Sequence, residues 1–192
     1  MQPGSPADLR RRFCTGRSCL DLVHTGGEGA LARWEIVNDP DDLGHLLGVV
    51  LGLPPLPANE ADLAAMRPLR AALTRIAYDL AEGSRPPIPV DPPRPDDIAT
   101  VNAAAAVPPL VPALRPDGGT TFVAPTATAA LSTLARDAVD LFGGPLARRI
   151  RVCAAENCGL LLVDTSRPGR RRWCSMELCG NRAKIRTHRS RA

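Results

Sequence analysis

Four cysteines near the C-terminal end of the chain constrain its fold more than any other feature. Cys153 and Cys158 have four residues between them, Cys174 and Cys179 repeat that spacing, and fifteen residues separate the two pairs. Zn²⁺ takes four thiolate ligands in a tetrahedron, and two tight turns deliver them in pairs, so the spacing predicts one structural zinc ion per chain. No position would remain open for catalysis. The alternative is four unrelated buried cysteines, and the repeated spacing favours zinc.

The residues around these cysteines predict a treble-clef-like zinc finger, made of a knuckle, a β-hairpin and a helix. Between the pairs, "GLLLVDTS" favours a strand, "RPGR" a turn and "RRRW" a return strand. The segment "SMELCGNRAKIRTHR" favours a helix whose first turn supplies the fourth ligand. We expect a small core from Trp173, Met176, Leu178 and Ile185. A module of about forty-five residues buries too little apolar surface to fold alone, so chelation should unfold it.

Charge is divided unevenly along the chain. Residues 148–192 carry twelve basic and three acidic side chains, a net charge of +9, whereas residues 1–147 carry twelve basic and seventeen acidic ones, a net charge of −5. An acidic body with a basic end is typical of a protein in which one end meets a polyanion.

The rest of the chain predicts a mainly helical body with short strands, so the whole is of the α+β class. We expect a regulatory or sensor domain over residues 1–145 and the zinc finger over residues 146–192. The proline-rich stretch 84–95 predicts an extended linker. The predicted elements are a strand from about Ser18 to Thr25, a helix from Pro40 with Asp39 as its N-cap, a helix over 59–83 that Pro68 kinks or restarts, a shorter helix over 95–106, a hairpin around Asp117 and Gly118, and a helix from near Pro125 to Gly143.

Two motifs resemble known families. The run from Cys153 to Arg191, which includes Cys179, Gly180, Asn181 and Arg182, resembles the CGNR zinc finger. The N-terminal "GRSCLDLVHT" resembles the start of the ABATE domain, which usually precedes that finger and is described as a stress-induced transcription regulator. The resemblance implies a bacterial regulator with a zinc-dependent end that binds nucleic acid.

The basic residues of the finger are the expected nucleic-acid contacts, because arginine forks match phosphates and the guanine edge. On the predicted helix, Arg182, Arg186 and Arg189 form one stripe, and a second stripe lies on the far side. We expect the helix to enter the major groove and the return strand to contact the phosphate backbone. The predicted set is Arg170, Arg171 and Arg172 on the strand, and Asn181, Arg182, Lys184, Arg186, His188, Arg189 and Arg191 on the helix.

These features predict a zinc-dependent, DNA-binding transcriptional regulator whose body senses a small-molecule effector or mediates dimerisation. Double-stranded DNA is preferred over RNA because the tail lacks aromatic platforms that stack single-stranded bases. A homodimer is considered because a single finger offers little contact area. The alternatives are a zinc-stabilised RNA-binding module, a protein-interaction module, and a solvated cationic surface without a partner.

Four polar residues within otherwise apolar elements of the body are the expected lining of an effector pocket: Arg17, Asp21, His24 and Trp34. The alternative is that they are ordinary core and surface residues. Coupling between body and finger is expected along "GGPLARRIRVC", which begins at Gly143.

The remaining sequence features give weaker evidence about function. Cys14 and Cys19 repeat the ligand spacing and His24 follows, but no partner pair exists, so buried free thiols are favoured over a second zinc site. Neither cysteine lies in a nucleophile motif, so we predict no catalytic residue and no enzyme activity. No apolar run is long enough to cross a membrane and the start resembles no secretory signal, so we expect a cytoplasmic protein without membrane contact.

Overall fold

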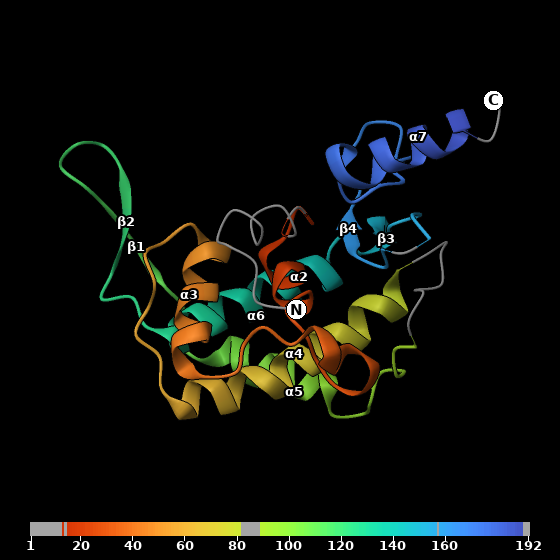
Figure 1. The fold of residues 1–192 in the computed structure, drawn as a ribbon. Helices are drawn as coiled ribbons and strands as arrows, with labels where there is room; N and C mark the ends of the chain where they lie inside the picture. Colours follow the sequence, from red (N-terminus) through yellow and green to blue (C-terminus); the bar gives the residue numbers. More distant parts are fainter. Residues whose placement is uncertain (1–12, 14, 82–88, 157, 190–192) are drawn as a thin grey trace.

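A computed structural model describes residues 13, 15–81, 89–156 and 158–189, and helices dominate its fold (Figure 1). The α+β class, with a mainly helical body and a C-terminal finger, is confirmed. The body consists of α2 (Ser18–Val23), the 3₁₀-helix η1 (Gly29–Trp34), α3 (Pro40–Leu51), α4 (Glu60–Leu80), α5 (Asp97–Ala106), β1 (Val111–Leu114), β2 (Thr120–Val123) and α6 (Ala127–Gly143). The finger adds the 3₁₀-helix η2 (Ala147–Arg149), β3 (Ile150–Val152), β4 (Leu161–Val163), the π-helical turn η3 (Met176–Gly180) and α7 (Asn181–Arg189).

The longer helices begin at side chains that cap their free N–H groups. Asp39 accepts a hydrogen bond of 2.8 Å from the Asp42 N–H at the start of α3. Asn59 and Asp62 form a reciprocal capping box at the start of α4, and Thr126 caps α6. The cap at Asp39 was predicted, and the helices predicted over 59–83 and from near Pro125 begin close to their predicted starts, although their caps were not predicted.

Helix α4 runs unbroken through Pro68, so the predicted restart does not occur. Proline removes one backbone hydrogen bond and crowds the preceding turn. The neighbouring side chains Met66 and Leu69 are buried in the core and hold the helix on both sides of the proline.

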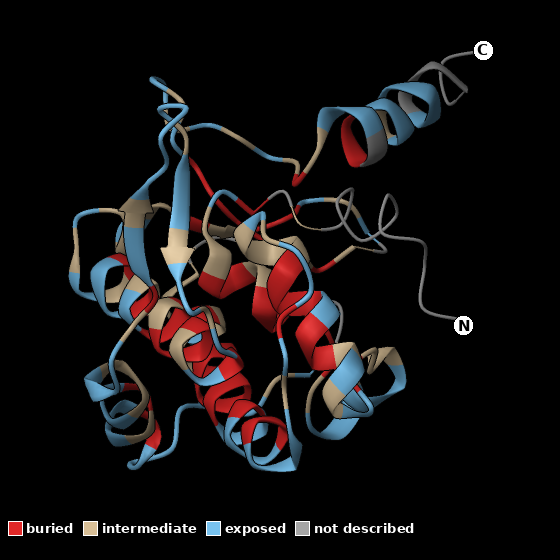
Figure 2. Ribbon diagram, turned by 90° about the vertical axis from the view of Figure 1, so that its left-hand side faces the viewer, coloured by how far each residue is buried: buried red, intermediate tan, exposed pale blue. Residues whose placement is uncertain are grey.

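The core of the body lies around α2, which contacts α3, α4 and α6. Figure 2 shows that the buried residues of these helices face inward together. The fully buried side chains are chiefly leucines, as expected for a chain with few aromatic residues: Leu20, Leu22, Leu43, Leu47, Leu73, Leu134 and Leu141.

Two glycines in α3 are required by a close approach of the following loop. The Leu56 N–H donates to the Gly44 carbonyl oxygen at 3.1 Å. A Cβ atom at Gly44 would collide with the Leu56 carbonyl oxygen, and one at Gly48 would lie 2.8 Å from the Pro54 oxygen. The loop therefore packs against the helix backbone, and this compensates for the low helix propensity of glycine.

The strand predicted over Ser18–Thr25 is wrong, because Ser18–Val23 form helix α2. Its buried residues at positions 19, 20, 22 and 23 have the spacing of one side of a helix rather than the alternation of a strand, which the prediction overlooked. A helix of six residues is not stable alone, so tertiary contacts decide its conformation. The decisive contact comes from α6, where the Asp137 carboxylate accepts the Cys19 N–H at 2.9 Å.

Strands β1 and β2 form the predicted hairpin, with Val111 opposite Val123 and Leu114 opposite Thr120. The turn is closed by the Gly118 N–H, which donates to the Arg115 oxygen at 3.0 Å. Figure 1 shows this hairpin projecting from the opposite side of the body to α7.

Strand β4 pairs with β3, and not with the "RRRW" segment as predicted. Residues 170–173 form no strand. Instead their backbone is bound by other groups: the Asp164 carboxylate accepts the Arg171 N–H at 2.9 Å, and the Arg172 oxygen accepts the Ala154 N–H at 2.8 Å. The two strands of the β3–β4 hairpin therefore lie on either side of the first cysteine pair in the sequence.

The β3–β4 hairpin belongs to two cores at once. Ile150, Val152, Leu161 and Val163 point to one face and are buried in the core of the body. Leu162 points to the other face and joins the cysteine cluster. Side chains alternate across a strand, so one short hairpin joins the body to the finger.

Within the described residues, the structure contains no helix that has both the length and the apolar character to cross a membrane.

Candidate metal centre and basic surface

The first cysteine pair lies in the loop of the β3–β4 hairpin. Cys153 directly follows β3, and its N–H donates to the Leu160 carbonyl oxygen at 2.8 Å. Cys158 comes before Gly159, which has a φ of 75° and so turns the chain back towards β4. The hairpin thus forms the expected knuckle and presents two sulfur atoms on one side.

The second pair comes from the segment that leads into α7. Cys174 precedes the turn η3, and Cys179 lies within it, where its N–H donates to the Ser175 oxygen at 3.1 Å. The Cys174 N–H also points at the Cys153 sulfur, at 3.4 Å. An N–H donor aimed at a sulfur stabilises a thiolate, so the backbone already favours the charged form that binds metal.

The four sulfur atoms, from Cys153, Cys158, Cys174 and Cys179, all lie within 4.8 Å of one another. The Sγ atoms of Cys158 and Cys179 each lie 3.6 Å from that of Cys174. A tetrahedron with zinc–sulfur bonds of about 2.3 Å places its sulfurs about 3.8 Å apart. The donor set and its spacing therefore fit one structural zinc ion.

Hydrogen bonds within this cluster also favour ionisation of one sulfur. The thiols of Cys158 and Cys174 donate towards Cys153 and lower the pKa of its thiol below the ordinary value. The same hydrogen bonds raise the pKa of the Cys158 and Cys174 thiols, so without metal one thiolate is favoured and zinc must displace the remaining protons.

Asp164 and Arg171 support the metal centre through hydrogen bonds between their side chains and backbone groups of the segment that precedes Cys174 and of Cys174 itself. Burial alone would raise the pKa of Asp164, but hydrogen bonds from Ser166 and Arg171 outweigh burial and hold it below its ordinary value. The Arg171 guanidinium donates to the Trp173 oxygen at 3.0 Å and to the Cys174 oxygen at 2.5 Å. Arg171, expected to contact phosphate, thus also holds the chain that carries the third cysteine.

The small core of the finger differs from the expected one. The cysteines pack with buried Leu162 and with partly buried Ala155, Leu160 and Trp173. Met176 and Ile185 are 53% and 54% exposed, so their predicted core positions are wrong. The side chain of Leu178 lies outside the described residues. The β3–β4 hairpin supplies the apolar contact expected from the helix, since Leu162 reaches the cysteine cluster from β4.

The finger exposes many of its predicted nucleic-acid residues. Helix α7 extends away from the body, and most of its described surface is exposed (Figure 2). The Arg172 guanidinium lies over the Trp173 ring at 4.9 Å. The side chains of His188 and Arg189, and all of Arg191, lie outside the described residues. The exposed members of the predicted set are Arg170, Arg172, Asn181, Arg182, Lys184 and Arg186.

A groove of about 380 Å³ separates α7 from the knuckle. Arg182, Ile185 and Arg186 line it from the helix, and Glu156 and Ala155 line it from the knuckle. The Arg186 guanidinium forms an ion pair with the Glu156 carboxylate across the groove. One of the two predicted stripes on the helix therefore faces the knuckle.

The four expected effector residues do not line one cavity in the described part of the chain. Arg17 pairs with Asp137 at 2.8 Å and with Asp140 at 2.7 Å. Asp21 accepts a hydrogen bond of 2.7 Å from the Thr15 hydroxyl, and burial raises its pKa to about 6. The Arg17 ion pairs hold the start of α2 against α6, whereas the Asp21 hydrogen bond is local.

The other two expected effector residues lie elsewhere. His24 faces β4, where its Nε2 atom accepts the Leu161 N–H at 3.0 Å. Burial lowers the pKa of His24 to about 4, which keeps the ring neutral and able to accept. Trp34 lies in η1, under the Arg33 guanidinium at 3.9 Å.

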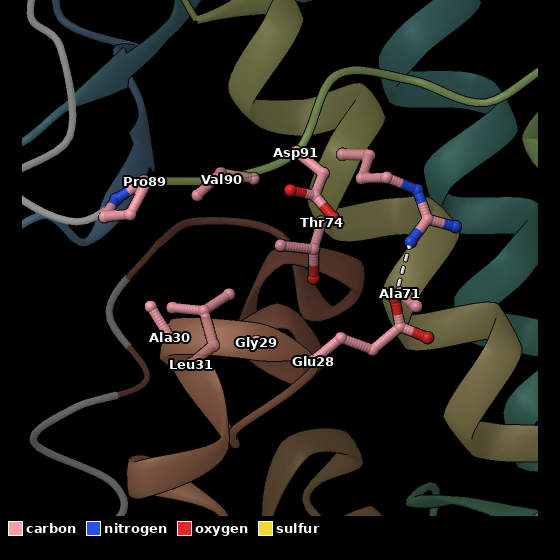
Figure 3. Close-up of a pocket in the computed structure, with 10 residues that line it drawn as sticks. Glu28, Gly29, Ala30, Leu31, Ala71, Thr74, Pro89, Val90 and Asp91 are labelled. Carbon is pink, nitrogen blue, oxygen red and sulfur yellow. Dashed lines mark hydrogen bonds and ion pairs between the residues drawn. The ribbon is translucent and has the colours of Figure 1, made fainter.

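A different cavity lies between η1, α4 and the segment before α5 (Figure 3). Its volume is about 50 Å³, and Glu28, Leu31, Thr74, Arg75 and Asp91 contribute to its walls. Ligand pockets usually have volumes of about 300–1,000 Å³. This cavity is therefore large enough only for a few water molecules or a very small group.

Among the described residues, three hydrogen bonds connect the body to the finger, and none was predicted. The Tyr78 hydroxyl of α4 donates to the Gly159 oxygen of the knuckle at 2.8 Å. The other two reach β4: His24 accepts from the Leu161 N–H, and the Thr15 oxygen accepts the Val163 N–H at 2.8 Å. Tyr78 and Gly159 are 81 residues apart in sequence, so no local pattern could have indicated the contact.

Cys19 is a buried free cysteine, as expected. Burial raises the pKa of its thiol well above the ordinary value, so it stays protonated and is a poor nucleophile. Cys14 lies outside the described residues.

Comparison with known families adds to this geometry. Residues 16–145 match the ABATE family model, described as "Putative stress-induced transcription regulator", and residues 149–192 match the model of the CGNR zinc finger. The matches confirm both resemblances in the predicted order, and both are regulator or zinc-finger families rather than enzyme families. A search of curated proteins finds no significant match.

Proposed function

This chain belongs to the ABATE family and ends in a CGNR zinc finger, and on that premise we propose that it is a transcription regulator whose finger binds double-stranded DNA. In this proposal residues 1–145 form the regulatory body and residues 146–192 form the DNA-binding unit. Cys153, Cys158, Cys174 and Cys179 hold the zinc ion, which acts only as a structural cross-link.

One observation carries the proposal: the finger is a cationic surface built around a metal site. Of its three acidic residues, Asp164 is fully buried and hydrogen-bonded, so its charge adds little to the surface. A rigid array of exposed cations attracts a polyanion strongly, since each phosphate contact releases counterions. The exposed cations are Arg148, Arg167, Arg170, Arg172, Arg182, Lys184 and Arg186.

The shape of the finger favours a duplex. Helix α7 stands clear of the body (Figure 1), and a single α-helix fits the major groove of B-form DNA. Arg170 and Arg172 precede this helix and are available for phosphates, which fix the register of a protein on DNA. Trp173 is partly buried in the cysteine core, so it offers little surface on which single-stranded bases could stack.

The test is a salt titration of binding by the zinc-loaded full chain, on double-stranded and single-stranded DNA of the same sequence. We expect stronger binding to the duplex, with a slope of log K against log salt of about −0.9 per phosphate neutralised. Arg182→Gln should make the slope shallower by about 0.9. Arg67→Gln changes an equally exposed arginine on α4 and should leave the slope unchanged.

Three results would contradict the proposal. A flat slope means that phosphates are not neutralised, tighter binding to the single strand favours an RNA-binding module, and absence of binding favours a protein-interaction module. Removal of zinc with a chelator should abolish the duplex binding, because the second cysteine pair and α7 lose their anchor.

For the body we propose dimerisation through the β1–β2 hairpin. The cavity beside Arg75 is too small for a typical ligand, whereas the β1–β2 hairpin exposes Val111, Leu114 and Val123 by 55%, 81% and 59%. Exposed apolar side chains on a two-stranded hairpin are suited to pairing with a second copy. Analytical ultracentrifugation of the wild type and of Leu114→Asp tests this role, and a monomeric wild type refutes it.

A further inference from the structure

The described part of the finger exposes two carboxylates, Glu156 and Glu177, and the first lies beside arginines of the groove. Glu156 lies in the knuckle and pairs with Arg186 of α7 across the groove that separates them. The side chains of Glu156 and Arg186 are 76% and 51% exposed, so the pair contributes little to folding stability. A carboxylate here repels phosphate, so its position calls for an explanation other than stability.

The pair constrains the direction in which Arg186 presents its donors. A guanidinium has five N–H donors in a planar fork, and Glu156 accepts from Nη1 only. The N–H donors on Nη2 and Nε of Arg186 remain available for another acceptor, in the plane of the guanidinium that the ion pair orients. On the same face of α7, Arg182 and exposed Ile185 line the groove beside this fork.

A carboxylate next to an arginine changes which acceptors that arginine favours. A phosphate that approaches Arg186 meets the negative charge of Glu156 at the same time, and the repulsion weakens the contact. The guanine edge is uncharged and offers two acceptors, O6 and N7, that match an arginine fork.

We infer that Glu156 is a specificity-determining residue, which holds Arg186 in position for the guanine edge in the major groove and disfavours its binding to phosphate. The inference rests on the proposed function. In this role Glu156 does not contact DNA itself and acts only through Arg186.

The test compares Glu156→Gln with Glu177→Gln in the zinc-loaded full chain. Both substitutions remove one exposed carboxylate from the finger and keep its shape. The probes are the duplex that the wild type selects from a random-sequence library, the same duplex with each guanine replaced by deazaguanine that lacks N7, and a scrambled duplex.

For the wild type and Glu177→Gln, we expect loss of N7 to weaken binding by about fivefold or more. For Glu156→Gln, we expect this penalty to fall by about threefold, while binding to the scrambled duplex becomes tighter than that of Glu177→Gln. Arg186→Lys keeps the charge without the planar fork and should reduce the N7 penalty as Glu156→Gln does.

The outcomes separate this inference from the proposed function. If Glu156→Gln and Glu177→Gln behave alike on all three duplexes, the inference is overturned and DNA binding stands. If the wild type binds no duplex, both are overturned. Zinc content and thermal unfolding of each variant establish that the comparison is made between folded proteins.

Discussion

Mild acid should weaken the junction between the body and the finger through His24. The neutral ring accepts the Leu161 N–H, and burial lowers the pKa of His24 to about 4 in the folded chain. In the unfolded chain the ring titrates near its ordinary value of about 6.5. Between these values only the unfolded state is protonated, so the free energy of unfolding falls as the pH falls from about 6.5 to about 4.

The size of this effect follows from the two pKa values. Between about pH 7.5 and about pH 5, the His24 contribution lowers the free energy of unfolding by about 2 kcal/mol. Asp21 acts in the opposite direction, because its pKa is raised to about 6 and the protonated carboxyl is favoured in the folded state. It adds about 1.4 kcal/mol of stability over the same range, which hides most of the His24 effect in the wild type.

The effect is therefore measured as a difference between two proteins. His24→Gln keeps an acceptor for the Leu161 N–H and does not titrate. We expect urea unfolding to show that the stability of this variant, relative to wild type, rises by about 2 kcal/mol from about pH 7.5 to about pH 5. Asp21 and the zinc site titrate in both proteins and cancel. A relative stability that does not change with pH would refute the assignment of His24 as a buried neutral acceptor.

Three further predictions concern the metal, a helix and the body–finger contact. Cys174→Ser should bind no zinc and no DNA, yet a cooperative thermal transition of the body should remain, because β3 and β4 are packed in its core; complete unfolding would contradict this. Gly44→Ala should lower the free energy of unfolding by about 2 kcal/mol or more through its collision with a loop carbonyl, whereas Gly143→Ala, with open space around it, should change stability little in urea unfolding. Tyr78→Phe should cost about 1 kcal/mol, because it leaves the Gly159 oxygen without its hydroxyl donor, and a variant as stable as wild type would show that water replaces the hydroxyl.

The cysteine spacing made the metal centre predictable. Two pairs at the same short spacing bring two sulfurs together within each turn, and zinc chemistry needs only that two such turns meet. The helix start at Asp39 was predictable for a similar reason, since a cap acts within three residues of itself.

The elements that were predicted wrongly are short and depend on distant partners. The apolar residues of Ser18–Val23 have helical spacing, but six residues are too few for a stable helix alone, and the carboxylate of Asp137, more than a hundred residues later, accepts a hydrogen bond from its first turn. The partner of β4 was misassigned because β3 and residues 170–173 are both close in sequence. The bonds that residues 170–173 make to Asp164 and Ala154 decide between them.

The sequence by itself determined the chemistry of the protein: four thiolates at metal-binding spacing, a cationic end and an acidic helical body. Local spacing and net charge do not depend on how distant segments meet. The tertiary structure alone decided that the β3–β4 hairpin shares its two faces between the body and the cysteine cluster, that His24 and Tyr78 reach the finger, and that Glu156 lies against Arg186. The contacts of His24, Tyr78 and Glu156 each join residues at least thirty positions apart, and such contacts form only when the packed core brings those segments together.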